Sequence, residues 1–185
     1  NPLQEALQPE GNTDFSQLLE KIEKICKALK WPVIVKEVGW GISAEVARKL
    51  KDAGVAAIDV AAAGGTSWSQ VEKYRIKDRN KFEVAGAYRD WGIPLVDSII
   101  QVREAAPDIP IIASGGLRNG IDLGKSIALG ATLGGFAGAI LKAAVTSYEQ
   151  ALDQINIIES QLRIAMFASG MRNIEHLKHA SLTMD

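Results

Sequence analysis

The sequence has 185 residues, with 21 Lys plus Arg against 22 Asp plus Glu, so its formal net charge is −1 at pH 7, and 47% of its residues are hydrophobic. This balance excludes an intrinsically disordered chain, which needs low hydrophobicity and high net charge, and it offers no basic excess for a nucleic-acid partner. The longest uncharged stretch, residues 126–141, is shorter than the roughly 20 apolar residues of a membrane span. The single cysteine, Cys26, excludes an internal disulfide and is typical of a reducing cytoplasm.

The first five residues, Asn1-Pro2-Leu3-Gln4-Glu5, contain no initiator Met, no basic region and no apolar region. They therefore do not form a signal peptide. Together with the organisation described next, they indicate that the chain begins inside a larger domain.

Helix and strand patterns alternate along the sequence. Asp14 is expected to cap the first helix, whose apolar residues recur at helical spacing and define one buried stripe that includes Cys26. Residues 68–94 are expected to form a long irregular excursion, and such loops are often functional. In chain order, the expected elements are helix 14–29, strand 33–37, helix 43–50 capped by Ser43, strand 55–60, helix 96–106, strand 109–113, helix 122–129, strand 131–136, and helices 148–167 and 174–179.

This fourfold alternation predicts a parallel α/β sheet. About four βα units make half of a (β/α)8 TIM barrel, so we predict that residues 1–185 are the C-terminal half of a single barrel. A half barrel leaves two open sheet edges, which favour association. We expect these edges to be covered by the N-terminal half of the barrel or by a second copy, in a homo-oligomer.

Glycine-rich segments follow three of the predicted strands. They are Gly64-Gly65-Thr66-Ser67, Ser114-Gly115-Gly116 and Ala137-Gly138. Any one of them is compatible with a simple tight turn. Three at the carboxyl ends of neighbouring strands favour a phosphate site, because glycine lets backbone N–H groups converge on an anion.

Several ionisable residues need separate interpretations. Lys36 lies in an apolar strand, and because a buried lysine is costly unless paired, we predict a ligand partner for it. We expect Asp59, in the next strand, to be either a member of a structural pair or a hydrogen-bonded carboxylate. His176 and His179 are three residues apart, but no third metal ligand is nearby, so a surface helix is favoured over a metal site.

The combination of motifs resembles type 2 isopentenyl-diphosphate isomerase over nearly the whole chain. The Ser-Gly-Gly-x-Arg-x-Gly element alone is shared with other FMN-binding barrels, so the specificity lies in the combination. The matching segments are Asn1-Pro2-Leu3-Gln4-Glu5, Gln8-Pro9-Glu10-Gly11, Val35-Lys36-Glu37-Val38-Gly39, Gly64-Gly65-Thr66-Ser67-Trp68, Asp90-Trp91-Gly92-Ile93-Pro94, Ser114-Gly115-Gly116-Leu117-Arg118-Asn119-Gly120 and Ala165-Met166-Phe167.

The resemblance implies an FMN-binding barrel that interconverts isopentenyl and dimethylallyl diphosphate in isoprenoid biosynthesis. It implies reduced FMN, Mg²⁺, and NADPH as the reductant of the flavin. Gln4 would be catalytic and bind substrate, Asn1 would also bind substrate, and Glu5 would bind Mg²⁺. The implied FMN contacts are Lys36, Thr66, Gly115, Gly116, Leu117, Arg118, Ala137 and Gly138.

Two other functions stay open at this point. One is a different FMN-dependent barrel oxidoreductase, such as an α-hydroxy acid oxidase. That class places a catalytic His after the sixth barrel strand, and residues 61–69 contain none. The other is a half barrel that binds flavin or phosphate without catalysing a reaction.

Overall fold

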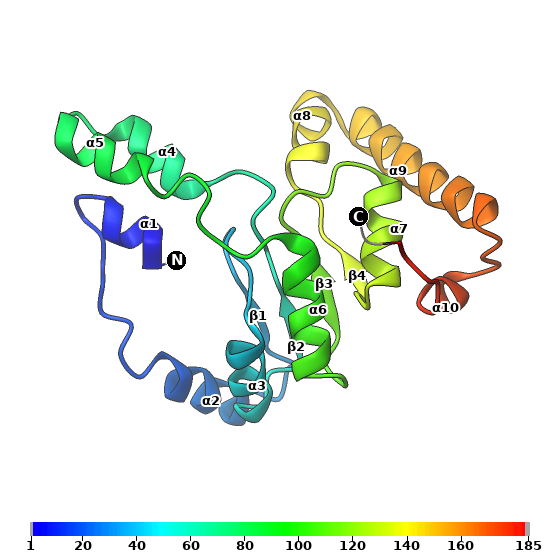
Figure 1. Cartoon of the computed structure of the whole chain (residues 1–185), viewed down its shortest axis with the longest axis horizontal. Helices are drawn as coiled ribbons and strands as arrows, with labels where there is room; N and C mark the ends of the chain where they lie inside the picture. The colour runs from blue at the N-terminus through cyan, green and yellow to red at the C-terminus, as the bar shows by residue number, and fades with distance from the viewer. Residues whose placement is uncertain (1, 184–185) are drawn as a thin grey trace.

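The structure is a computed structural model that describes residues 2–183. Its sheet has four parallel strands in the order β1-β2-β3-β4, which run side by side through the centre of Figure 1. The prediction of an α/β fold with about four βα units is confirmed. Each strand is shorter than predicted: β1 is Ile34–Lys36, β2 is Ala57–Asp59, β3 is Ile111–Ala113 and β4 is Leu133–Gly134.

Helices alternate with the strands and group into three sets. α3 packs beside α6, α7 and α8 pack against α9, and α4 and α5 pack on each other, with α1 against α4. In Figure 1 the α4–α5 pair extends away from the sheet. The helices are α1 (Pro2–Leu7), α2 (Leu18–Ala28), α3 (Ala44–Asp52), α4 (Trp68–Arg75), α5 (Arg79–Gly86), α6 (Leu95–Ala105), α7 (Gly120–Ala128), α8 (Gly138–Thr146), α9 (Tyr148–Ala168) and α10 (Ile174–Leu177).

The hydrophobic core lies between the two central strands and the helices α3 and α6. Ile58 of β2 and Ile111 of β3 are fully buried, as are Ile99 and Val102 of α6. The outer strands are open by contrast, because each has a neighbour on one side only. The sheet therefore has a closed centre and two uncovered edges among the described residues.

The first helix departs from its prediction. Asp14 does not cap it, since α2 begins after Gln17, which has a positive φ of 57°, and the Asp14 carboxylate instead accepts a hydrogen bond from the Ser16 amide at 2.9 Å. No residue of α2 is buried. Of the predicted stripe, one side that includes Cys26 packs against the core, while Leu18 and Ile25 are each 48% exposed. The core therefore covers only part of the predicted apolar stripe of α2.

The expectation of an irregular segment over residues 68–94 is wrong, because helices α4 and α5 occupy most of it. Asp78 starts α5 by accepting a hydrogen bond from the Lys81 amide at 2.9 Å, a standard cap. The segment returns to the sheet at Ile93, whose amide donates to Trp40 at 2.8 Å and whose carbonyl accepts from Ala63 at 3.0 Å. Helices α1 and α8 were not predicted either.

Candidate functional site

The loops that follow the strands meet at the carboxyl edge of the sheet, backbone against backbone. A Cβ on Gly64 would lie 2.6 Å from the carbonyl oxygen of Gly115, and a Cβ on Gly116 would lie 2.5 Å from the carbonyl carbon of Gly64. Gly115 and Gly116 have φ values of +104° and +111°, which favour glycine. Only glycine fits this contact between the loops after β2 and β3.

The loop after β3 and the start of α8 together present unused backbone donors. The amides of Gly116, Leu117, Gly138 and Ala139 donate no hydrogen bond to any residue in the described range 2–183. β3 and β4 are paired, with Ala113 opposite Gly134, so the two loops leave the sheet side by side.

The start of α8 also has room for a ligand. A Cβ added to Gly138 would meet no atom within 4 Å. A helix N-terminus with free N–H groups favours an anion. These residues therefore fit the phosphate group of FMN.

A hydrogen bond joins the ends of β2 and β3 beneath these loops. The Ser114 hydroxyl donates to Asp59 Oδ1 at 2.6 Å, and the Ala61 amide donates to the same oxygen at 3.1 Å. Of the two alternatives expected for Asp59, the hydrogen-bonded carboxylate is confirmed.

Lys36 does not occupy a buried position. Its side chain is exposed, and Nζ donates to the Glu37 carbonyl at 2.7 Å. The apolar run around it forms β1, which among residues 2–183 pairs with β2 alone, so that strand has an open side. Glu37 shapes the following loop, because its Oε2 accepts hydrogen bonds from the amides of Val38, Gly39 and Trp40 at 2.6 to 2.7 Å.

The remaining predicted cofactor residues differ in exposure. Leu117 is 5% exposed and belongs to the core. Thr66 is exposed, and a Cβ added to Gly39 would lie 3.5 Å from its carbonyl oxygen. The Arg118 side chain is exposed and forms no ion pair with the residues the structure describes.

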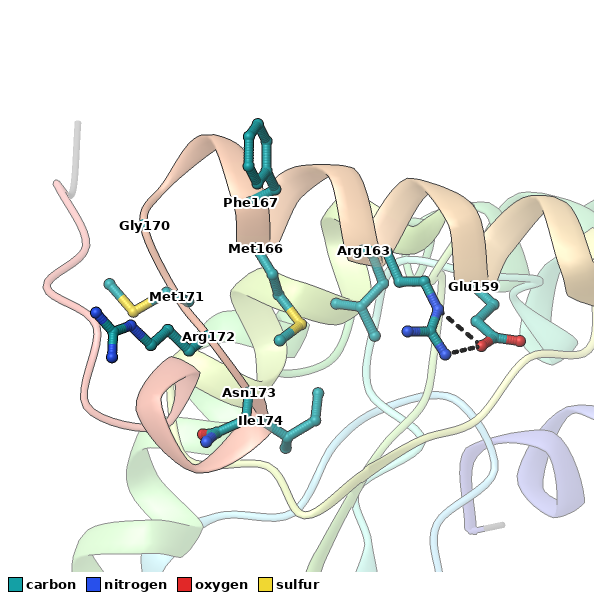
Figure 2. Close-up of a pocket in the computed structure, with 10 residues that line it drawn as sticks. Glu159, Arg163, Met166, Phe167, Gly170, Met171, Arg172, Asn173 and Ile174 are labelled. Carbon is teal, nitrogen blue, oxygen red and sulfur yellow. Dashed lines mark hydrogen bonds and ion pairs between the residues drawn. The ribbon is translucent and has the colours of Figure 1, made fainter.

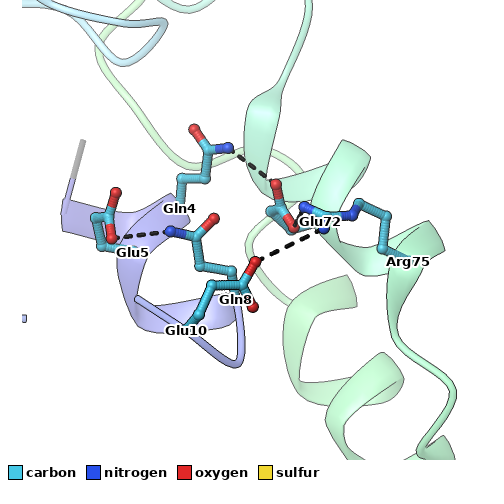
Figure 3. A network of polar contacts seen from close by, with 6 residues as sticks. All are labelled: Gln4, Glu5, Gln8, Glu10, Glu72 and Arg75. Carbon is cyan, nitrogen blue, oxygen red and sulfur yellow. Dashed lines mark hydrogen bonds and ion pairs between the residues drawn. The ribbon is translucent and has the colours of Figure 1, made fainter. Parts of the chain in front are cut away.

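The candidate substrate residues lie on α1, which rests on α4 (Figure 3). Gln4 Nε2 donates to Glu72 Oε1 at 2.9 Å. Glu5 Oε2 accepts from Gln8 Nε2 at 2.8 Å and from the Asn12 amide at 2.7 Å. Asn1, the other predicted substrate residue, lies outside the described residues.

Sequence reasoning missed Glu72. It belongs to a charged segment expected to be a loop, yet it is 3% exposed. An available signal was its position three residues before Arg75, the spacing of neighbouring side chains on a helix.

Among the described residues, Glu5 does not belong to a cluster of metal-binding side chains. Within residues 2–183 there is no group of three or more His, Cys, Asp or Glu side chains that could hold a metal ion. Glu5 Oε1 has no donor among those residues. Mg²⁺ is commonly held by one or two carboxylates together with substrate phosphate oxygens and water, so a single available carboxylate oxygen fits a metal shared with a diphosphate.

A separate pocket of about 790 Å³ lies between α9 and α10 (Figure 2). Arg163 and Glu159 form an ion pair at 2.6 Å on one side of it. It lies away from the strand ends and contains none of the predicted site residues; its lining is Glu159, Leu162, Arg163, Met166, Phe167, Gly170, Met171, Arg172, Asn173 and Ile174.

No helix in the described part of the chain has the length and apolar character needed to cross a bilayer.

Comparison with known families agrees with the glycine-rich loops and the parallel sheet. The FMN-dependent dehydrogenase family matches residues 5–184. The chain belongs to this family. Its similarity to solved structures gives the same fold: a lactate oxidase from Pediococcus acidilactici has a TM-score of 0.69 at 24% identity, covering 94% of this chain and 42% of that one. A mandelate oxidase variant solved with the monooxide FMN adduct has a TM-score of 0.64 at 19% identity, covering 87% and 44%.

Curated relatives of this FMN-dependent family member are more similar in sequence. Isopentenyl-diphosphate delta-isomerase from Xanthobacter autotrophicus is 50% identical over 100% of this chain and 54% of its own length. The enzymes of the same name from Oceanobacillus iheyensis and Rickettsia rickettsii are 49% and 48% identical, over 98% and 100% of this chain. The predicted resemblance is confirmed. The chain spans about half the length of the curated relatives it matches.

Proposed function

We propose that the protein isomerises isopentenyl diphosphate to dimethylallyl diphosphate, with reduced FMN and Mg²⁺ as cofactors. The observation that carries this proposal is the 48 to 50% identity to isopentenyl-diphosphate delta-isomerases across the chain. The oxidases with the same fold are 24% identical or less to this chain. Their similarity therefore supports the fold assignment and does not indicate that the chain catalyses their reactions. NADPH is proposed as the reductant, and the cytoplasm as the location.

The FMN phosphate is proposed to lie at the N-terminus of α8, against the loop after β3. Backbone amides in that loop and at the start of α8 carry no protein partner in the described range, and they act in concert with the helix dipole. When bound, reduced flavin supplies the acid–base chemistry at unactivated carbon that ordinary side chains do not perform easily. The proposed FMN contacts are Lys36, Thr66, Gly115, Gly116, Leu117, Arg118, Ala137 and Gly138.

The substrate is proposed to lie between this loop edge and α1. Gln4, and Asn1 at the start of the chain, would hydrogen-bond the substrate without adding charge. Glu5 would bind Mg²⁺ through Oε1, since Gln8 and the Asn12 amide already hold Oε2. Fixing one carboxylate oxygen orients the other, which lowers the cost of ordering the site when the ion and the diphosphate bind.

A complete site needs more sheet than these residues supply. β1 and β4 each have one strand neighbour in the described range, and Ile34 and Leu133 at those edges are 55% and 59% exposed. We propose that residues 1–185 are the C-terminal half of a single FMN-binding barrel, completed by its N-terminal half, and that the barrels form a homo-oligomer. A second copy closing the sheet is the alternative arrangement.

The test is turnover by an assembled barrel. The chain is joined to the N-terminal half of the Xanthobacter autotrophicus relative, loaded with FMN, reduced and supplied with Mg²⁺ and isopentenyl diphosphate. We expect dimethylallyl diphosphate to form, and no oxidation of lactate by the oxidised enzyme. Lactate oxidation without isomerisation would favour the oxidoreductase function, and flavin binding without either reaction would favour a non-catalytic half barrel.

A further inference from the structure

The placement of α1 depends on few contacts. It has six residues, none of them buried, and a helix of this length is not stable in water by itself. It packs against α4, and Figure 3 shows polar side chains joining the two helices. The candidate side chains of α1 are therefore oriented by whatever fixes α1 on α4.

The carboxylate of Glu72 is the centre of this contact. Its side chain is 3% exposed; Oε1 accepts a hydrogen bond from Gln4 Nε2 at 2.9 Å, and Oε2 accepts one from Arg75 at 2.7 Å. An ionised carboxylate can only accept hydrogen bonds. It therefore selects the amino end of the Gln4 amide, and the Gln4 carbonyl oxygen points away from Glu72 in Figure 3.

Arg75 connects this buried carboxylate to the far end of α1. A second guanidinium nitrogen of Arg75 lies 3.7 Å from Glu10 Oε1, in the turn that follows the helix. Arg75 thus reaches one carboxylate on α4 and one beyond α1. A planar guanidinium can serve two carboxylates in this way, whereas an ammonium is a single point charge.

The two ion pairs of Arg75 differ in how much they stabilise the structure. The Glu10 side chain is 65% exposed, and an exposed ion pair contributes little to stability. Glu72 is buried, and removing the partner of a buried carboxylate leaves a charge without compensation, which destabilises the structure strongly. The contact with Glu72 should therefore stabilise the structure more than the contact with Glu10 does.

We propose that Arg75 is a positioning residue: by pairing with Glu72 it holds the carboxylate that accepts the Gln4 amide hydrogen bond, and so keeps α1 on α4, whereas its contact with Glu10 contributes little. The significance of the Gln4 orientation for substrate rests on the proposed function, but the placement of α1 does not. By resemblance Gln4 faces the substrate, and Arg75 would act on the reaction only through it.

The experiment is amide hydrogen exchange of the 185-residue chain, read in α1 and, as an internal reference, in β2. In Arg75→Gln we expect the α1 amides to exchange at least roughly tenfold faster, because the buried carboxylate loses its charged partner. Glu10→Gln, the matched control, should change the rate by less than about fivefold. Arg75→Lys should fall between them. In all three variants β2 should exchange as in the parent.

Exchange in Arg75→Gln equal to the parent, or equal effects of Arg75→Gln and Glu10→Gln, would overturn the proposal. If Arg75→Gln unfolds the chain, the double variant Glu72→Gln/Arg75→Gln decides, since it leaves no unpaired buried charge. We expect its α1 amides to exchange faster than in the parent with β2 unchanged. Parent-like exchange of α1 in the double variant contradicts a role for Arg75.

A second readout separates this proposal from the proposed function. In the assembled barrel, Arg75→Gln should lower kcat at least roughly tenfold while leaving FMN affinity unchanged. If the parent barrel does not isomerise isopentenyl diphosphate but exchange responds as expected, only the function is wrong. If the parent turns over and Arg75→Gln has parent-like exchange and kcat, only the positioning role is wrong.

Discussion

The Ser114 hydroxyl donates a 2.6 Å hydrogen bond to the Asp59 carboxylate, linking the end of β3 to the end of β2. The two residues are 55 positions apart in the chain. Because the glycine-rich loops begin beside this pair, it sets the separation at which they leave the sheet. Ser114→Ala should lower the free energy of unfolding by about 1.5–3 kcal/mol, since a hydrogen bond to a charged group is lost. Urea denaturation measures this change, and Ser160→Ala on the exposed face of α9 should cause no loss.

The two glycines Gly116 and Gly138 should respond differently to a methyl group. Gly116→Ala forces a residue with a Cβ into a φ of +111° and against the backbone of Gly64, so it should destabilise the chain by about 1–3 kcal/mol. Gly138→Ala meets open space and should leave urea stability unchanged or slightly higher. It should nevertheless weaken FMN binding about tenfold in a flavin titration of the assembled barrel. Unchanged FMN affinity would argue against a phosphate beside Gly138.

Lys36 should matter to the redox state of a bound flavin more than to folding. Its side chain is exposed and bonded only to a backbone carbonyl within the described residues, so Lys36→Met should not reduce urea stability. A cation near the flavin stabilises the negative charge of the reduced form. We expect the variant to bind reduced FMN at least about tenfold more weakly, with a smaller effect on oxidised FMN. Equal losses for both redox states would remove the electrostatic role.

Glu5 provides a direct test of the metal assignment. Glu5→Gln keeps the size of the side chain and removes the charge that attracts Mg²⁺. In the assembled barrel it should raise the Mg²⁺ concentration for half-maximal turnover at least about tenfold, while FMN affinity stays the same. Glu20→Gln, a change to an exposed carboxylate of α2, is the control and should have no effect. A Mg²⁺ dependence that Glu5→Gln leaves unaltered would exclude Glu5 as the ligand.

The pKa of Glu45 is lowered, first by a hydrogen bond from Lys49 and then by the charge of the same residue. A carboxyl whose pKa is lower in the folded state contributes stability above its unfolded pKa and loses that contribution as the pH falls. Glu45→Gln should therefore reduce stability slightly at pH 7 and low salt. The difference from the parent should disappear between about pH 5 and pH 3 and should also shrink in high salt. Urea denaturation curves of the parent and Glu45→Gln at pH 7 and at about pH 3 check this.

The parts of the fold that sequence predicted are those with a strong local signal. β2 and β3 are short apolar runs followed by glycines whose positive φ values serve the close loop contact. Ser43 has both the residue type and the spacing of a cap, and its hydroxyl accepts from the Val46 amide at 3.3 Å.

The parts that sequence did not predict depend on tertiary contacts. α4 lacks a clear apolar period because a buried position is occupied by Glu72, whose partners Gln4 and Arg75 come from α1 and from the helix itself. The exposure of Lys36 follows from the edge position of β1, which the composition of a strand does not reveal. A charged residue in the sequence predicts a solvent-exposed position only where no partner distant in the chain can bind it.

The segment that carries α4 and α5 leaves the sheet after Ala63 and returns at Ile93, and these two residues are hydrogen-bonded to each other. Its two ends are therefore fixed together by this backbone hydrogen bond, just beyond the end of β2. Insertions, deletions and substitutions between these anchors need not disturb the strand register. Helix α5, which contributes none of the proposed site residues, is thus the part of this segment where related barrels can diverge above the same glycine-rich edge, and a natural unit for exchange between them in engineered enzymes.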